Sequence, residues 1–128
     1  MKAKIINITD SCVQMETDFG MFRGKWMSGK LVMNGTYFIE IDSSPVTDAN
    51  QIQLSDQTKP FIHDFGDYIL INGYVEEIED NLLFLRLSYN LMMIVIYCDI
   101  TGFQECWVRI KVDHFEIYGE LIKGQVKG

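Results

Sequence analysis

Few residues of this sequence could do chemistry, and its two histidines are the first to consider. His114 and Glu116 would share one face of a strand, and His63 is followed directly by Asp64. A zinc site needs three or four ligands, mostly of nitrogen or sulfur character, and no group of Cys and His has the spacing for one. We therefore expect no metal site and no cofactor.

The three cysteines are an odd number without a C-x-x-C spacing, which favours a reducing compartment over a disulfide framework: Cys12, Cys98 and Cys106. Cys98 closes an apolar run, so we expect it to pack as a small hydrophobic residue. A reactive thiol needs a base or a positive field beside it, and His114 could reach Cys106 only across strands. There is also no G-x-S-x-G motif. We therefore expect no enzyme.

Four carboxylates occur within five consecutive positions: Glu76, Glu77, Glu79 and Asp80. Such a cluster suits a basic protein partner, whose association it would accelerate. It equally suits an exposed strand end, where charge discourages edge-to-edge pairing. Trp26 and Trp107 are the aromatic side chains that could anchor such an interface, because Trp is enriched at interface centres, and each could equally be a core residue.

An alternative binding chemistry comes from Trp107, Arg109 and Lys111, which alternate along one predicted strand. An aromatic platform beside cations is how oligonucleotide-binding (OB) barrels hold single strands. The overall charge opposes this, because 11 Lys and Arg stand against 18 Asp and Glu, a net charge of −7. Phosphate binding depends on the number of cations, so the composition disfavours nucleic acid.

The composition describes one folded domain. A chain of 128 residues with 48% hydrophobic and 12% aromatic residues can bury a core without disulfides, which excludes a disordered chain. The start of the sequence has no apolar stretch of signal-peptide length. The strongest apolar run, residues 82–98, is interrupted by Arg86 and falls short of the ~20 residues that span a bilayer. We expect a cytoplasmic protein that does not enter the membrane.

Apolar and polar residues alternate with a period of two along most of the chain, as in half-buried strands. The inward positions of this pattern are Leu31, Met33, Tyr37, Ile39, Ile41, Ile69, Ile71, Val75, Leu83, Leu85, Leu87, Val108, Ile110 and Val112. The phase slips at Glu76 and Glu77, which indicates a β-bulge. No apolar stripe with helical spacing extends over 11 residues, so we predict an all-β fold, an antiparallel β-barrel or sandwich with little helix.

Several segments receive finer predictions. Residues 2–8 and 22–27 are predicted strands, and residues 10–21 could hold one helical turn. Residues 43–60 are polar and are predicted to form a long loop. Residues 92–98 are apolar at every position, which favours a central strand covered on both faces.

Two Asn-Gly pairs, Asn34-Gly35 and Asn72-Gly73, each lie inside an alternating segment. The apolar parity continues across both pairs, so we predict strands that bend there rather than hairpin turns. Segments 31–35 and 69–73 are similar, but the likeness fades beyond them. We therefore treat residues 1–128 as a single β domain and claim no duplicated domain. Residues 66–98 resemble the opening meander of an OB-type barrel.

These observations together predict a non-enzymatic acidic protein that recognises a basic protein partner. Its most specific form is a bacterial immunity-type protein that neutralises a basic toxin. Two alternatives stay open: a small-ligand or single-stranded nucleic-acid-binding module of OB type that uses Trp107, Arg109 and Lys111, and a subunit of a larger β assembly whose strand 92–97 completes a shared sheet. We expect a monomer or a small homo-oligomer.

Overall fold

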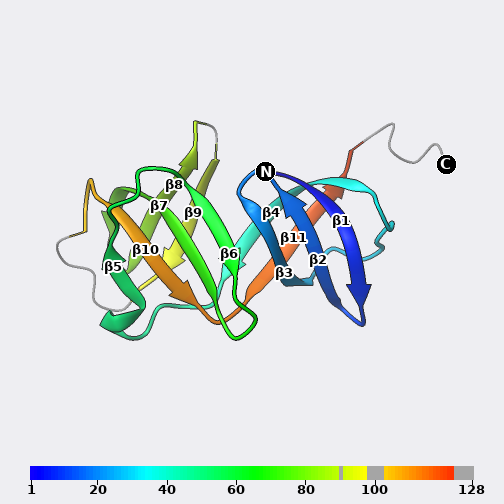
Figure 1. The fold of residues 1–128 in the computed structure, drawn as a ribbon, viewed down its shortest axis with the longest axis horizontal. Coiled ribbons are helices and arrows are strands. Elements are labelled where there is room, and N and C mark those ends of the chain that lie inside the picture. The colour runs from blue at the N-terminus through cyan, green and yellow to red at the C-terminus, as the bar shows by residue number, and fades with distance from the viewer. Residues whose placement is uncertain (90, 98–102, 123–128) are drawn as a thin grey trace.

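The computed structural model describes residues 1–89, 91–97 and 103–122 and confirms the all-β prediction. Its strands are β1 (Lys2–Thr9), β2 (Cys12–Thr17), β3 (Gly20–Trp26), β4 (Thr36–Ser43), β5 (Ile52–Leu54), β6 (Phe61–Asp64), β7 (Ile69–Glu79), β8 (Leu82–Ser88), β9 (Leu91–Ile96), β10 (Trp107–Val112) and β11 (Phe115–Leu121). The one helical element among them is a 3-10 turn, η1 (Ala49–Gln51). The strands form a closed barrel and a second sheet, which lie side by side in Figure 1.

The closed barrel has the strand order β1-β2-β3-β11-β4, and β4 pairs back with β1. Its neighbours are antiparallel except β3 and β11, which run parallel through Glu116 beside Lys25 and Ile117 beside Trp26. The barrel is therefore mixed, not purely antiparallel as the sequence predicted. Alternate residues fill its interior, and the fully buried ones include Ile5, Val13, Met15, Phe22, Phe115 and Ile117.

The second sheet has the order β5-β10-β7-β8-β9, and β6 pairs with the first residues of β7, next to the end of β8. The meander predicted for residues 66–98 is present as β7, β8 and β9. It belongs to this second sheet, however, and not to the closed barrel. The predicted bulge is confirmed by the register shift between Val75 and Glu77. Residues 71, 75, 83, 85 and 87 face the core as predicted.

The two halves repeat one pairing pattern, with equivalent residues 70 or 71 positions apart. Asp10 and Asp80, at the two first hairpin turns, both have positive φ, 55° and 53°. The parallel pair Trp26–Ile117 of the barrel corresponds to the parallel bridge Tyr97–Val46 of the second sheet.

Backbone hydrogen bonds follow the same repeat. The Asn34 amide donates to Ile5 O, and the Glu105 amide donates to Val75 O. Few side chains are shared at the equivalent positions, so the similarity of segments 31–35 and 69–73 gave the wrong spacing. The sequence supported no claim of a duplicated domain, and the repeat becomes visible only in the backbone pairing.

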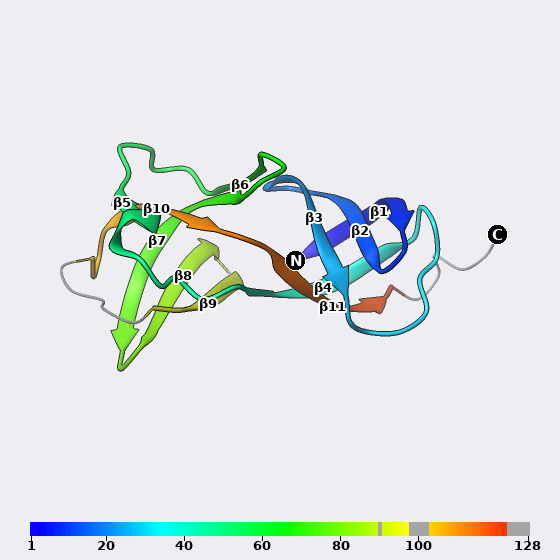
Figure 2. The same cartoon turned by 90° about the horizontal axis from the view of Figure 1, so that it is seen from below.

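Each half lends a strand to the other. In the barrel, β11 lies between β3 and β4, while in the second sheet residues 46–54 reach from β9 to β10. Thus β4 continues into the second sheet, and β10 continues into the barrel as β11; Figures 1 and 2 show both segments crossing the middle of the molecule. Ser44 joins the crossing segments, because its amide donates to His114 O at 2.9 Å and its Oγ accepts from the Asp113 amide at 2.9 Å.

Four local predictions are wrong. Asn34 lies in a turn with φ 62°, so β4 starts only at Thr36, whereas Asn72-Gly73 does lie inside the long strand β7. Residues 10–21 form a hairpin turn and strand β2 rather than a helical turn. Residues 43–60 include β5 and η1, because Ile52 is drawn into the core opposite Ile110. Strand β9 was predicted as a central strand covered on both faces, but it is the last strand of its sheet and one of its faces is open.

Candidate functional site

The outward faces of β4 and β11 carry aromatic and acidic side chains in alternation with the barrel core. The residues on this face are Phe38, Glu40, Asp42, Glu116, Tyr118 and Glu120. The antiparallel register places Asp42 directly opposite Glu116, and Glu40 opposite Tyr118. Like charges in directly opposite positions destabilise a sheet, so this face holds repulsion that the fold itself does not need.

Strand β9 carries a second outward face, which is entirely apolar. Met92, Ile94 and Ile96 are 37%, 49% and 47% exposed, while Met93 and Val95 between them are buried. A contiguous exposed apolar patch on a small protein commonly marks an interaction surface.

A groove of about 710 Å³ runs between these two faces. Its apolar lining includes Phe38, Ile41, Leu91, Met92, Ile94 and Tyr118, and its carboxylates are Glu40, Asp42 and Glu120. Among the described residues that line it, none is Lys or Arg. Figure 2 shows β9, β4 and β11 along the lower side of the molecule, with β6 along the upper side. The groove thus combines an apolar lining with carboxylates.

A cation does lie at one end of this face. Lys2 on β1 pairs with Phe38 and places its Nζ 5.8 Å from the centre of the Phe38 ring. On the opposite side, Lys25 of β3 is the parallel neighbour of Glu116. Both flank the acidic face, and the charged side chains that line the groove itself are the carboxylates of Glu40, Asp42 and Glu120.

The predicted acidic cluster lies elsewhere, at the turn between β7 and β8. Glu76, Glu77, Glu79 and Asp80 are all exposed there. Arg86 of β8 offsets part of their charge, because its Nε donates to Glu76 Oε2 at 2.8 Å. These carboxylates line neither the groove nor the two pockets that contain Arg23.

The two tryptophans have different positions. Trp26 is 7% exposed and packs edge-to-face on Tyr37 at 5.1 Å inside the barrel, so it cannot anchor a partner as predicted. The reason is that β3 turns this residue toward the barrel interior, where it lies against Gly119. Trp107 is half-buried on the outward face of β10, 5.8 Å from the Tyr74 ring.

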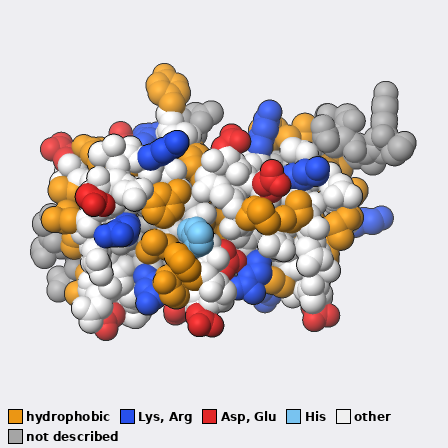
Figure 3. Space-filling view, viewed as in Figure 1, with side chains coloured by type: hydrophobic (Ala, Val, Ile, Leu, Met, Phe, Trp, Pro, Cys, Tyr) orange, Lys and Arg blue, Asp and Glu red, His pale blue; other side chains and the backbone are white. Residues whose placement is uncertain are grey.

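The structure places Trp107, Arg109 and Lys111 on one outward face of β10, alternating with the buried Val108, Ile110 and Val112. Further rings adjoin this face. Lys111 Nζ lies 4.2 Å from the Tyr68 ring centre, Tyr68 stacks on Phe65 at 5.0 Å, and Phe65 lies 4.2 Å from His63. In Figure 3 hydrophobic groups, basic groups and a histidine gather over β6, β7 and β10.

The described histidine and cysteine side chains do not come together as a catalytic pair. Cys106 precedes β10 and His114 follows it, so the pair considered from the sequence is held at opposite ends of one strand. Instead His114 and Cys12 both line a pocket of about 360 Å³ with Arg23, but no hydrogen bond joins them in the part of the chain that is described. No group of three His, Cys, Asp or Glu side chains there could hold a metal ion. Cys98 lies outside the described residues.

Comparison with models of protein families, with curated protein sequences and with solved structures finds no significant match for this chain. Within the described residues, no helix has the length and apolar character needed to cross a membrane.

The sequence interpretation did not identify the groove residues, although two aromatic residues in polar positions of the alternating pattern could have indicated them. Phe38 lies on the polar parity of its segment, beside Glu40 and Asp42, where an aromatic side chain is out of pattern. Tyr118 occupies the same kind of position between Glu116 and Glu120. Their meeting with Met92 and Ile94 had no local signal, because β4, β9 and β11 are far apart in the sequence.

Proposed function

We propose that this chain is a non-enzymatic acidic binding protein that holds a basic segment of a partner protein in the groove between β9 and the β4–β11 face. The observation that carries the proposal is the combination in one groove of exposed apolar side chains with three carboxylates and no Lys or Arg among the described residues that line it. Apolar contact supplies affinity, and charge complementarity supplies specificity and association rate.

The electrostatics favour a basic occupant over a second copy of the chain. A second copy would bring the same carboxylates toward Glu40, Asp42 and Glu120, at a cost in repulsion. A Lys or Arg side chain between Asp42 and Glu116 would instead relieve the repulsion that their opposite placement creates. The partner is therefore a basic protein rather than this chain itself.

The immunity-type role is the specific form of the proposal. Binding of this kind neutralises a basic toxin when the bound segment belongs to the toxin's working surface. The free thiols of Cys12, which is exposed, and Cys106, which is half-buried, suit a reducing compartment such as the cytoplasm.

The test is an NMR titration of the isotope-labelled protein with a blocked octapeptide of four Val-Lys repeats, with the Val-Glu octapeptide as the charge control. We expect amide shifts in β4, β9 and β11 with the basic peptide at about 1 mM, the range of a weak probe. The double variant Glu40→Lys/Glu120→Lys should abolish them. The matched variant Glu77→Lys/Glu79→Lys, which changes the β7–β8 turn by the same charge, should keep them.

Three results would overturn the proposal. These are shifts confined to the β7–β8 turn, equal shifts with the acidic peptide, and no shifts at the groove at this concentration. Because all four exchanged side chains are exposed, the variants should fold as the wild type does, which a thermal unfolding curve checks.

A second candidate function comes from the face of Trp107, Arg109 and Lys111. The observation in its favour is the continuous series of Lys111, Tyr68, Phe65 and His63, which joins a cation to three aromatic rings on one surface. Titration of Trp107 fluorescence with oligothymidine tests it. Salt-sensitive quenching that Lys111→Glu removes would support single-strand binding, and no quenching would exclude it.

A further inference from the structure

Strands β3 and β9 hold equivalent positions in the two halves of the molecule, but the outer edge of β3 is covered and that of β9 is not. In the barrel, the Trp26 amide donates to Ser11 O on the β1–β2 turn at 2.9 Å, so Trp26 points its backbone groups toward that hairpin. Alternate residues point to opposite edges of a strand, and Arg23 therefore faces away from β2. That edge is covered: the Arg23 amide donates to Asp64 Oδ2 at 3.0 Å, and the Ile62 amide donates to Phe19 O at 2.8 Å.

The equivalent edge in the second sheet is open. The Tyr97 amide donates to Asn81 O at 2.9 Å, which repeats the Trp26 bond and fixes the same phase in β9. On the other edge, Ile96 O accepts from the Val46 amide at 2.8 Å. By alternation, Met92 and Ile94 direct their N–H and C=O groups to this outer edge. No strand in residues 1–89, 91–97 or 103–122 pairs with them there.

Ile94 holds the place in β9 that Arg23 holds in β3, and its outer edge borders the acidic groove. In the barrel, residues 61–66 of the same chain supply the cover. The barrel half therefore shows which kind of segment can cover the equivalent edge of β9: an extended stretch whose backbone and side chains form hydrogen bonds with the free N–H and C=O groups of the strand. A free strand edge beside an apolar patch is also a general site for strand addition.

We propose that the partner segment binds β9 as an added β-strand, paired with the backbone of Met92 and Ile94. This inference rests on the proposed function and specifies its mode. One face of the added strand then points into the groove, so an alternating segment directs either its basic side chains toward Glu40 and Asp42 or its apolar side chains toward Phe38 and Tyr118. The occupant is an extended segment in which basic and apolar residues alternate.

Three forms of the Val-Lys octapeptide separate strand addition from simple docking: the ordinary amide peptide and two ester peptides. In one ester peptide the backbone N–H groups of all Val residues are replaced by ester oxygens, in the other those of all Lys residues, and all side chains are kept. We expect at least one ester form to bind about tenfold more weakly, since two lost hydrogen bonds are worth roughly 1.4 kcal/mol. We also expect the amide form to slow hydrogen exchange at Met92 and Ile94.

The outcomes distinguish this inference from the proposed function. If both ester forms bind at the groove as tightly as the amide peptide, or if the Met92 and Ile94 amides exchange at unchanged rates, strand addition is wrong while groove binding stands. If the amide peptide does not bind at the groove, the proposed function fails first.

A protein variant adds an independent check. Ile94→Pro removes the outward N–H without breaking a pair to β8, and edge strands tolerate such a proline. It should lose the peptide, while Ile94→Val should keep it. Retained binding by a folded Ile94→Pro variant would count against strand addition, and if that variant does not fold, the ester peptides still decide.

Discussion

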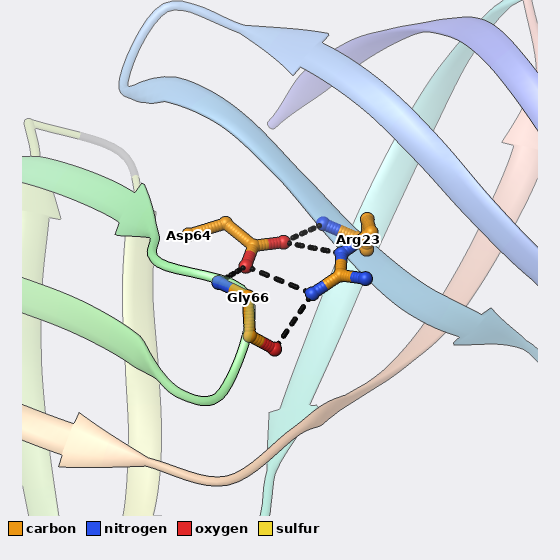
Figure 4. A network of polar contacts seen from close by, with 3 residues as sticks. All are labelled: Arg23, Asp64 and Gly66. Carbon is orange, nitrogen blue, oxygen red and sulfur yellow. Dashed lines mark hydrogen bonds and ion pairs between the residues drawn. The ribbon is translucent and has the colours of Figure 1, made fainter.

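Arg23 and Asp64 fasten the barrel to the second sheet through a two-pronged ion pair. Arg23 Nε lies 2.9 Å from Asp64 Oδ2, and Arg23 Nη2 lies 3.2 Å from Asp64 Oδ1. The Arg23 amide also donates to Oδ2, while the Gly66 amide donates to Oδ1 at 2.8 Å, as Figure 4 shows. The carboxylate thus ties strand β3 to the β6–β7 loop, 41 residues further along the chain.

The first prediction concerns the pH dependence of this pair. Burial opposes ionisation of Asp64, but the side-chain bond from Arg23 and the amide bonds from Gly66 and Arg23 outweigh it and hold the pKa of Asp64 below its usual range. A lowered pKa in the folded state stabilises the fold above the ordinary carboxyl pKa of about 4, and this stabilisation is lost as the pH falls through the folded pKa.

Urea unfolding between pH 7 and pH 2.5 measures this contribution. Asp64→Asn should cost about 1 kcal/mol at pH 7, a low figure because Arg23 is 47% exposed, and the difference from wild type should shrink in acid. Asp56→Asn is the control, because Asp56 is exposed and has no ion pair within the described residues. A constant difference for Asp64→Asn at every pH would contradict the prediction.

The second prediction tests the crossing of the exchanged segments. Ser44→Ala removes the hydroxyl that accepts from the Asp113 and His114 amides and leaves both amides without that partner. Since Ser44 is 7% exposed, we expect a loss of about 1–3 kcal/mol in the free energy of unfolding. Denaturant midpoints measure it, with the exposed Ser11→Ala as the comparison. Equal midpoints for the two variants would show that the hydroxyl does not hold the crossing.

The third prediction concerns the contact between β3 and β6. Gly20 has φ +134°, and a Cβ there would lie 2.2 Å from Ile62 O, a backbone atom that cannot easily move. Gly20→Ala should therefore destabilise the protein by more than 1 kcal/mol, roughly the cost of an incompatible backbone conformation plus a clash. Gly29→Ala is the matched control, since Gly29 also has positive φ but no atom within 4 Å. The two variants should differ in Tm, and similar Tm values would rule out the clash.

The fourth prediction separates the two tryptophans by accessibility. Trp26 is enclosed by the barrel, whereas Trp107 lies half-buried on a sheet surface. Acrylamide should quench the fluorescence of Trp26→Phe, which retains Trp107, several times more strongly than that of Trp107→Phe. Comparable quenching of the two variants would mean that Trp26 is open to solvent, as an interface anchor would be.

The fold could be predicted from the sequence wherever the signal was local. Alternation along a strand is set by neighbouring residues, so the all-β class, the inward faces of β7, β8 and β10 and the bulge at Glu76 and Glu77 could be read directly. The outward alignment of Trp107, Arg109 and Lys111 followed in the same way, because three alternate residues of one strand share a face whatever that strand pairs with.

Tertiary structure alone decided which strands meet. Nothing near β10 indicates that it runs on into the other half, nor does anything near β3 indicate a parallel neighbour at Ile117, because pairing depends on contacts between distant segments. The apolar run at residues 91–96 fits a central strand and an edge strand equally, and only the completed sheet leaves Ile94 open beside Glu40. The sequence thus determined which side chains point the same way, and long-range pairing determined which of them share a groove.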